Sequence, residues 1–469
     1  MAPSYLEALD LITADAERPR PSSSETVSLL NALNRTPVCT YRSPNSTPQF
    51  DTSAMDGYAL NSRATSTASP EKPVLFHVKG VIAAGDEPLR LSSVPGADSG
   101  LGINGPSTVF PCVEIMTGAR FPEAIEGSEG FDCCVKWEDI TVLEERNGCM
   151  AGNHYIQVTK PAQSQQNKRP AGGDFTKGDA IISLGETIRP RHIMALASVG
   201  LNEVEVTRKP KIGVFSTGTE LLSPDTKRKS GHRIQDANGP YTTAFLHDHR
   251  ADVDFIGVLD DGLDTMTWNL KHYLHKFDII ISTGAVSTGK FDLIPAALQR
   301  LGSRIIFHNI AIRPGHPALF AKIPRPPAET GIAVTTEAAF FGLPGNPVAS
   351  AACLRFLVLP YLQRLENQTP ASHFRSIAQH DLSQKKAVQR DDARKVGQDS
   401  LISKFPIEKD VFRPGIFDRR SSGEIDVMLI NDHSPGKIKP FLASNCWIHI
   451  PHGVSKLHAG DTVGIISNE

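Results

Sequence analysis

Five carboxylates in this sequence stand on short loops beside glycine or other small residues. They are Asp56, Asp174, Glu220, Asp236 and Asp292. Any one acid of this kind is more often a turn residue than a functional one. As a set they suit Mg²⁺, which takes oxygen ligands, and the activation of a water at phosphorus. The acids therefore favour metal-assisted chemistry at a phosphate group.

One stretch, residues 278–292, combines such an acid with groups that can hold an anion. A β-branched run predicts a strand buried on both faces, and small polar residues with two glycines follow before a helical pattern resumes at Leu293. A loop between a strand and a helix offers backbone N–H groups and hydroxyls to an anion. With Asp292 in the same loop, the stretch predicts a phosphate or oxyanion site with a divalent metal. A tight turn without a ligand is the alternative that the pattern leaves open.

The elements around this stretch alternate between strand and helix. Strand patterns at 211–216, 253–259 and 304–310 flank it, and helical patterns separate them. Such alternation predicts a doubly wound parallel sheet with helices on both faces. Ligands bind at the carboxyl edge of these sheets. We therefore expect Glu220, Ser287, Asp292 and Arg313 to converge there.

Length and composition limit the other possibilities. A chain of 469 residues exceeds what one core supports, so three or four domains are expected. The formal net charge of −2 shows no excess of basic residues of the kind that binds nucleic acid or an anionic membrane. The N-terminus lacks a signal-peptide pattern, and no segment is apolar enough to span a bilayer, so we expect a cytoplasmic protein. The seven cysteines show no CxxC spacing, which favours reduced thiols over a zinc site or a disulfide framework.

Eight segments, in order, carry a resemblance to a known family. The chain resembles, over nearly its whole length, the MoeA family of molybdenum insertases, which includes the gephyrin E domain. The matching segments are residues 53–59 (SAMDGYA), 115–119 (IMTGA), 168–174 (KRPAGGD), 216–221 (STGTEL), 234–238 (IQDAN), 282–289 (STGAVSTG) with Asp292, 313–317 (RPGHP) and 342–347 (GLPGNP).

The resemblance implies an elongated homodimer of four-domain subunits. Its active site would lie at the dimer interface, between the central domain of one subunit and the N-terminal domains of the other. We expect an N-terminal helical and linker domain (1–73 plus 155–205), a β-rich domain (74–154), a central molybdopterin-binding-like α/β domain (206–366) and a small C-terminal β-barrel-like domain (367–469).

The family chemistry is the Mg²⁺-dependent cleavage of adenylylated molybdopterin, with molybdate inserted into the dithiolene and AMP released. By resemblance, the five acids take the metal and phosphate roles, with Glu220, Asp236 and Asp292 as metal ligands. The resemblance also implies a set of substrate- and molybdate-binding residues: Thr117, Ser287, Gly289, Arg313, His316, Pro317, Asn346, Arg413 and Ser444. A molybdopterin adenylyltransferase is the implied transient partner, because the chain holds no second α/β unit of that kind.

Several positions depart from the family pattern. The family usually has a glycine at Ala285, an acid at Thr219, and lysines at Arg313 and His316. Arg313 keeps the charge, whereas His316 is a weaker donor to a dianion. The Ser-Ala-Asn order expected near the last domain's oxyanion contact reads Ala-Ser-Asn at 443–445. These departures bear on molybdate affinity rather than on fold.

They leave open a diverged, non-catalytic paralogue that serves as a dimeric scaffold. A molybdopterin adenylyltransferase is a third alternative, but that enzyme would not need the flanking β-rich segments.

Overall fold

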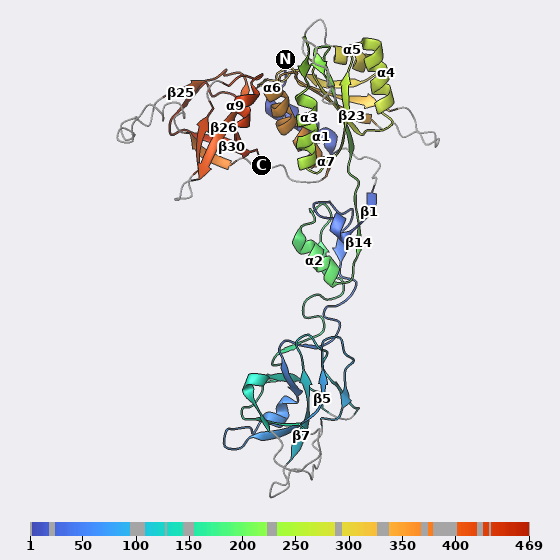
Figure 1. Ribbon diagram of the computed structural model, residues 1–469, viewed down its shortest axis with the longest axis vertical. Coiled ribbons are helices and arrows are strands. Elements are labelled where there is room, and N and C mark those ends of the chain that lie inside the picture. The colour runs from blue at the N-terminus through green and yellow to red at the C-terminus, as the bar shows by residue number, and fades with distance from the viewer. Residues whose placement is uncertain are drawn as a thin grey trace, which may run out of the picture. The chain divides into compact units, whose positions relative to one another are not determined.

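The computed structural model describes residues 2–17, 24–93, 108–126, 129–143, 154–222, 232–286, 293–325, 337–366, 374–378, 401–419, 425–430 and 433–468. The chain forms two compact units (Figure 1). The large unit comprises Met1–Glu25 and Thr207–Glu469, and the small unit comprises Thr26–Val206.

A six-stranded sheet lies at the centre of the large unit. Its order is β18-β15-β19-β23-β22-β20. The strands are β15 (Lys211–Thr217), β18 (Asp252–Leu259), β19 (Ile279–Thr283), β20 (Arg304–His308), β22 (Leu319–Pro324) and β23 (Glu337–Leu343). β19 is buried along its whole length, as its β-branched run predicts. The predicted α/β unit is therefore present.

Helices cover both faces of this sheet (Figure 1). Ile279 and Ile281 of β19 join one core, with α1 (Tyr5–Ala16), α3 (Asn238–Asp248), α6 (Pro347–Cys353) and α7 (Leu359–Leu365). Ile280 joins the opposite core, with α4 (Leu263–Tyr273) and α5 (Leu293–Arg300). The alternation follows from the two-residue period of a strand.

The expectation of a wholly parallel sheet is wrong at one strand. β22 runs antiparallel to both β23 and β20. A parallel neighbour needs a long crossover, usually a helix. β22 instead follows β20 after a short loop that contains only the two-residue strand β21 (Ile312–Arg313), so an antiparallel return is the direction this connection permits. No strand was predicted between residues 310 and 324.

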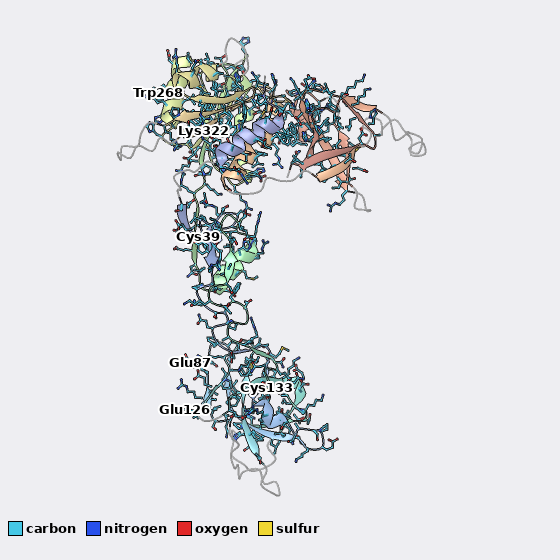
Figure 2. The ribbon with its side chains drawn as sticks, turned by 180° about the vertical axis from the view of Figure 1, so that it is seen from behind. Cys39, Glu87, Glu126, Cys133, Trp268 and Lys322 are labelled. Atoms are coloured by element: carbon cyan, nitrogen blue, oxygen red, sulfur yellow. The ribbon has the colours of Figure 1, made fainter. Side chains whose placement is uncertain are left out.

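The N-terminal helix belongs to the large unit. The sequence prediction grouped residues 1–73 together, but α1 packs Ala8 and Ile12 into the core of the central sheet. Asp15 on α1 accepts hydrogen bonds from the Lys322 ammonium (2.9 Å) and the Tyr361 hydroxyl (3.0 Å), and all three side chains are buried (Lys322 is labelled in Figure 2). The apolar spacing of this helix predicts its existence but not which unit it joins. The other predicted boundaries remain predictions.

A second sheet of the large unit is built from the last part of the chain. Its strands are β24 (Phe374–Ala378), β26 (Asp410–Arg419), β27 (Ile425–Leu429), β28 (Cys446–Ile450) and β30 (Thr462–Ser467). Pairing runs from β26 through β27, β24, β30 and β28 back to β26, so these five strands form a closed ring. β21 of the central domain pairs in parallel with β26 and joins the two sheets. Short elements complete this part: β25 (Leu401–Lys404), β29 (Lys456–His458) and α9 (Ile438–Leu442).

One helix among the described residues has the length and hydropathy of a membrane span, Pro347–Leu365. It consists of α6, a π-helical turn η4 (Leu354–Val358) and α7, and 72% of its apolar window is buried within the structure.

The small unit is mainly β. Its largest sheet has the order β10-β11-β5-β7-β4-β9, with β10 (Ile140–Leu143), β11 (His154–Val158), β5 (Val74–Ile82), β7 (Val109–Ile115), β4 (Gly57–Leu60) and β9 (Cys133–Lys136). Two-stranded ladders are β1 (Ser24–Ser28) with β14 (Glu203–Thr207), β2 (Tyr41–Arg42) with β13 (Ala180–Ile182), β3 (Thr52–Ser53) with β12 (Lys168–Arg169), and β6 (Arg90–Leu91) with β8 (Glu123–Ala124). Its helices are α2 (Pro190–Ser198), η1 (Leu29–Asn31), η2 (Ser62–Thr65) and η3 (Trp137–Asp139).

The buried Asp15–Lys322 pair gives a stability prediction for the large unit. Lys322→Met should lower the free energy of unfolding by about 3 to 5 kcal/mol, because it leaves a carboxylate buried without its cation. Tyr361→Phe should cost about 1 to 2 kcal/mol. Arg300→Ala, which removes an exposed pair with Asp264, serves as the control and should change stability little. Urea unfolding measures all three, and a Lys322→Met protein as stable as the control would contradict this role of the pair.

Candidate functional site

Three turns meet at the carboxyl edge of the central sheet. They follow β15, β19 and β23, and the Gly284 N–H donates to the Leu343 carbonyl (2.9 Å). A Cβ on Gly284 would lie 2.6 Å from the Thr217 carbonyl oxygen, so the turns after β15 and β19 touch there. Only glycine permits this approach, and its φ of +92° is also one that glycine adopts readily. At the sheet edge where the site is predicted, the backbone turns therefore contact one another.

Two predicted acids follow β15 on one small ladder. β16 (Leu221–Leu222) pairs with β17 (Ile234–Gln235), and the Ile234 N–H donates to the Glu220 carbonyl (2.7 Å). The Asp236 N–H donates to the Leu222 carbonyl (3.2 Å) in the same way. The ladder therefore fixes the backbone of both acids. The Glu220 side chain is exposed, whereas Asp236 is buried.

Asp236 caps the first turn of α3. Its Oδ1 accepts from the N–H groups of Asn238 (3.0 Å) and Gly239 (3.2 Å). Its Oδ2 is buried and has no hydrogen-bond partner in the part of the chain that the structure describes. A Cβ on Gly239 would lie 2.6 Å from Oδ2. The helix thus orients one carboxylate oxygen and leaves the other to bind a ligand, because an unpaired buried oxygen is costly.

Asn238 connects this acid to the turn after β23. Its side-chain amide donates to the Gly345 carbonyl (2.7 Å). The next residue, Asn346, is exposed and precedes the long helix that begins at Pro347. A Cβ on Gly436 would lie 3.4 Å from the Asn346 Oδ1, so a loop of the last domain reaches this turn.

The predicted arginines lie together on paired strands. Arg313 is on β21 opposite Val411 of β26, and Arg413 follows two residues later on β26. Arg413 donates to the Ile430 carbonyl (3.1 Å), but its Nε is buried and has no hydrogen-bond partner among the residues that the structure describes. Burial and the neighbouring Arg313 lower the pKa of Arg413. Neither guanidinium forms an ion pair among the described residues, although the two arginines are close enough to act on each other.

Sequence reasoning missed a third member of this group, His433. Its Nδ1 is buried and has no hydrogen-bond partner within the described ranges. Burial, Arg413 and Arg313 lower the pKa of His433 to about 4. No sequence signal marks this histidine, because its closeness to the arginines arises from the pairing of distant strands.

The other predicted anion ligands make local hydrogen bonds. His316 Nδ1 lies 2.6 Å from the Ile310 carbonyl, to which it can only donate. A neutral His316 therefore presents a lone pair at Nε2 and no second donor. The Ser444 hydroxyl donates to the Phe441 carbonyl (2.6 Å) and accepts from the Asn468 amide (3.1 Å). Pro317 lies half-buried beside His316.

Three predicted residues, Ser287, Gly289 and Asp292, lie outside the described residues. The segment before them ends at Val286, whose carbonyl accepts from His308 Nε2 (2.7 Å). Within the described ranges no group of three or more His, Cys, Asp or Glu side chains could hold a metal. The predicted metal set of Glu220, Asp236 and Asp292 therefore remains a prediction.

The small unit brings Asp56 and Thr117 together. The Thr117 backbone N–H (2.7 Å) and hydroxyl (2.8 Å) both donate to Asp56 Oδ1. These bonds hold the pKa of the exposed Asp56 carboxyl below its ordinary value. Asp174 is exposed on the loop after β12, where its N–H donates to the Thr47 carbonyl (2.9 Å).

Comparisons with known proteins agree on one family. The model of the MoeA N-terminal region (domain I and II) matches residues 3–200, and that of a probable molybdopterin binding domain matches residues 213–364. The molybdopterin molybdenumtransferase of Synechococcus elongatus is 32% identical over 366 residues, which cover 78% of this chain and 81% of that protein. The molybdopterin molybdenumtransferase of Haemophilus influenzae is 30% identical over 450 residues, covering 95% and 94%.

A solved structure shows the same fold. The molybdopterin biosynthesis MoeA protein of Pyrococcus horikoshii superposes with a TM-score of 0.71 at 23% identity, covering 100% of this chain and 99% of that one.

The turn after β19 gives a second stability prediction. Ala285, where the related family usually has glycine, adopts a φ of +51°. Ala285→Gly should raise the stability of the large unit by about 0.5 to 1 kcal/mol, because relief of the left-handed strain exceeds the added freedom of the unfolded chain. Gly284→Ala is the matched opposite and should destabilise by about 2 kcal/mol or more. Thermal unfolding of both proteins checks this, and a less stable Ala285→Gly protein would count against the left-handed turn.

Proposed function

Because the chain belongs to the MoeA family of molybdopterin molybdenumtransferases, we propose that it cleaves adenylylated molybdopterin with Mg²⁺, incorporates molybdate and releases AMP. Membership makes the chain a transferase of molybdenum-cofactor biosynthesis, which inserts molybdenum into molybdopterin. The observation that carries the finer proposal is the buried Asp236 Oδ2, which has no partner within the described chain.

The acids of the central domain fit a Mg²⁺ site. Asp236 offers a fixed and unpaired oxygen, and Glu220 offers an exposed carboxylate anchored by the same ladder. Oxygen donors of this kind are what Mg²⁺ takes, usually together with substrate phosphates. A bound Mg²⁺ would neutralise charge between phosphate oxygens and these acids. Asp292, by resemblance, would add a third carboxylate.

The protein's own groups would orient the substrate. The touching turns after β15, β19 and β23 present backbone groups at one edge, and Asn238 fixes the last of them through Gly345. We propose that Ser287 and Gly289 in the second turn hold the phosphates. By resemblance, Asp56, which accepts from Thr117, and Asp174 would contribute carboxylates from the small unit of a second copy of the chain.

The arginine pair fits the oxyanion substrate. Two close cations that form no ion pair among the described residues repel each other, and a tetrahedral dianion such as molybdate offsets both charges. Arg413 offers its unpaired Nε, and the planar Arg313 guanidinium is exposed beside it. We propose that His316, Pro317 and Ser444 complete this pocket, with Asn346 on the substrate side. Molybdate would thereby be held near the dithiolene while the bond to AMP breaks.

Asp236→Asn tests this function. AMP release from adenylylated molybdopterin should require both Mg²⁺ and molybdate in the wild type and fall by on the order of 10² in the variant, which removes the charge but keeps the helix cap. Binding of Mn²⁺, followed by its electron paramagnetic resonance, should weaken in parallel. Asp248→Asn, at the other end of α3, is the control. A wild type that binds Mn²⁺ but never releases AMP would favour the scaffold alternative over the enzyme.

A homodimer is the second part of the proposal. Three exposed apolar side chains support it, on neighbouring elements of the small unit: Leu30 (87% exposed), Leu184 (63%) and Met194 (73%). Exposed apolar side chains that gather in one patch mark an interaction surface, and these three lie on or beside elements that contact one another.

Met194→Glu should shift the chain from dimer to monomer at micromolar concentration, because it places a charge in the covered surface. Val142→Glu, an exposed apolar position on β10, is the control and should leave the assembly unchanged. Sedimentation velocity measures both, and a dimer unaffected by Met194→Glu would remove α2 from the interface.

A transient complex with a molybdopterin adenylyltransferase completes the proposal, since that enzyme's product would be this chain's substrate. Crosslinking during turnover tests it, and the absence of any crosslinked pair would argue for free diffusion of the intermediate.

A further inference from the structure

His433 lies at the start of a loop that hydrogen-bonds to the first turn of the long helix. The Pro435 carbonyl in this loop accepts from the Val348 N–H (2.9 Å) in the first turn of α6. Gly436 lies beside Asn346, as described above. The loop thus ties the last domain to the turn after β23, and it holds the imidazole at the edge where the predicted ligands gather.

The described charged groups that act on His433 are both positive. Arg413 on β26 and Arg313 on β21 both act on the ring, and together with burial they lower its pKa to about 4. Of the two described acids on the same strand, Asp410 already accepts from His449 Nε2 (2.7 Å), and Asp418 lies opposite Asp426 of β27. Lys437 on the loop is exposed. The imidazole is therefore neutral near pH 7 while no anion is bound.

The adjacent acid, Asp432, lies outside the described residues, so its own titration has to be separated by experiment.

We propose that His433 takes up a proton when an oxyanion dianion binds between Arg313 and Arg413, and that its Nδ1 donates a hydrogen bond to that anion. This inference rests on the proposed function, in which the anion is molybdate. The proton comes from solvent and returns to it when the anion leaves. The buried Nδ1 without a partner supplies the geometry, because a dianion offers the acceptor that the protein does not.

The dianion also reverses the local field. Two negative charges beside the ring favour its protonated form, whereas the arginines alone disfavour it. His316 serves this purpose less well, since its Nδ1 is engaged by the Ile310 carbonyl. His433 thus adds a positive charge only when there is an anion to receive it. The empty site thus avoids a further cation beside Arg313 and the buried Arg413, which would be costly.

The proposed proton uptake makes the affinity for the anion depend on pH. The pKa of His433 is low in the empty site and higher in the occupied one, so the occupied protein binds more protons between these two values. Anion affinity is therefore greatest at the acidic end of that window and falls as pH rises through the occupied-state pKa. The steepest possible change is about tenfold per pH unit for one proton.

Calorimetric titration with molybdate tests the proposal. Measured near pH 7 in two buffers of different ionisation enthalpy, the wild type should take up as much as one proton per anion. His433→Gln keeps a hydrogen-bond donor but cannot titrate; it should take up none of that proton and bind about tenfold more weakly. His458→Gln, a partly exposed histidine of the same domain, and Asp432→Asn are the controls, and both should match the wild type.

Equal proton uptake by His433→Gln and the wild type would overturn the inference, as would a wild type that binds molybdate without proton uptake. In both cases molybdate-dependent AMP release would leave the proposed function intact. A wild type that binds no molybdate and releases no AMP would overturn both. Equal unfolding midpoints of the four proteins show that the comparison is between folded chains.

Discussion

The site depends on charged side chains that lack an ion-pair partner among the described residues. They lie at the carboxyl edge of the central sheet and on the paired strands β21 and β26. Asp236 has a buried oxygen with no partner within the described chain, and Arg313 and Arg413 form no ion pair there. A folded protein usually pairs such groups, because buried charge without a partner is costly. Here the acids and the cations are held by separate elements, so each set remains open to a ligand of the opposite sign. A cation bound to the acids and an oxyanion bound to the arginines would compensate both sets of charges.

Rigid backbone connections keep these charges in place. The β16–β17 ladder and the N-terminus of α3 fix Asp236, while Asn238 and Gly345 connect it to the turn before the long helix. The loop that carries His433 bonds to that same helix, and β21 joins β26. The buried Asp15, Lys322 and Tyr361 then tie α1 to β22 and α7 beneath the sheet. The site is therefore preorganised by the core.

Much of the central domain could be predicted from sequence, because its signals are local. The β-branched run of β19 and the small residues after it mark a buried strand and its turn without any tertiary information. β22 was not predicted, and its antiparallel direction depends on its pairing with β20 and β23. α1 was recognised as a helix, but its partner Lys322 is more than 300 positions away in the chain. His433 could not be found, because only the pairing of β26 with both β21 and β27 brings the segment after β27 near the arginines; the family resemblance supplied the arginines themselves.

A crystal of the protein soaked with tungstate, a heavy analogue of molybdate, together with Mn²⁺ and AMP, tests the account most directly. Anomalous scattering locates both metals without reference to activity. The account predicts tungstate within hydrogen-bond distance of Arg413 Nε and His433 Nδ1, and Mn²⁺ bound to Asp236 Oδ2. Tungstate bound elsewhere with Arg413 Nε still unpaired, or Mn²⁺ away from Asp236, would contradict it.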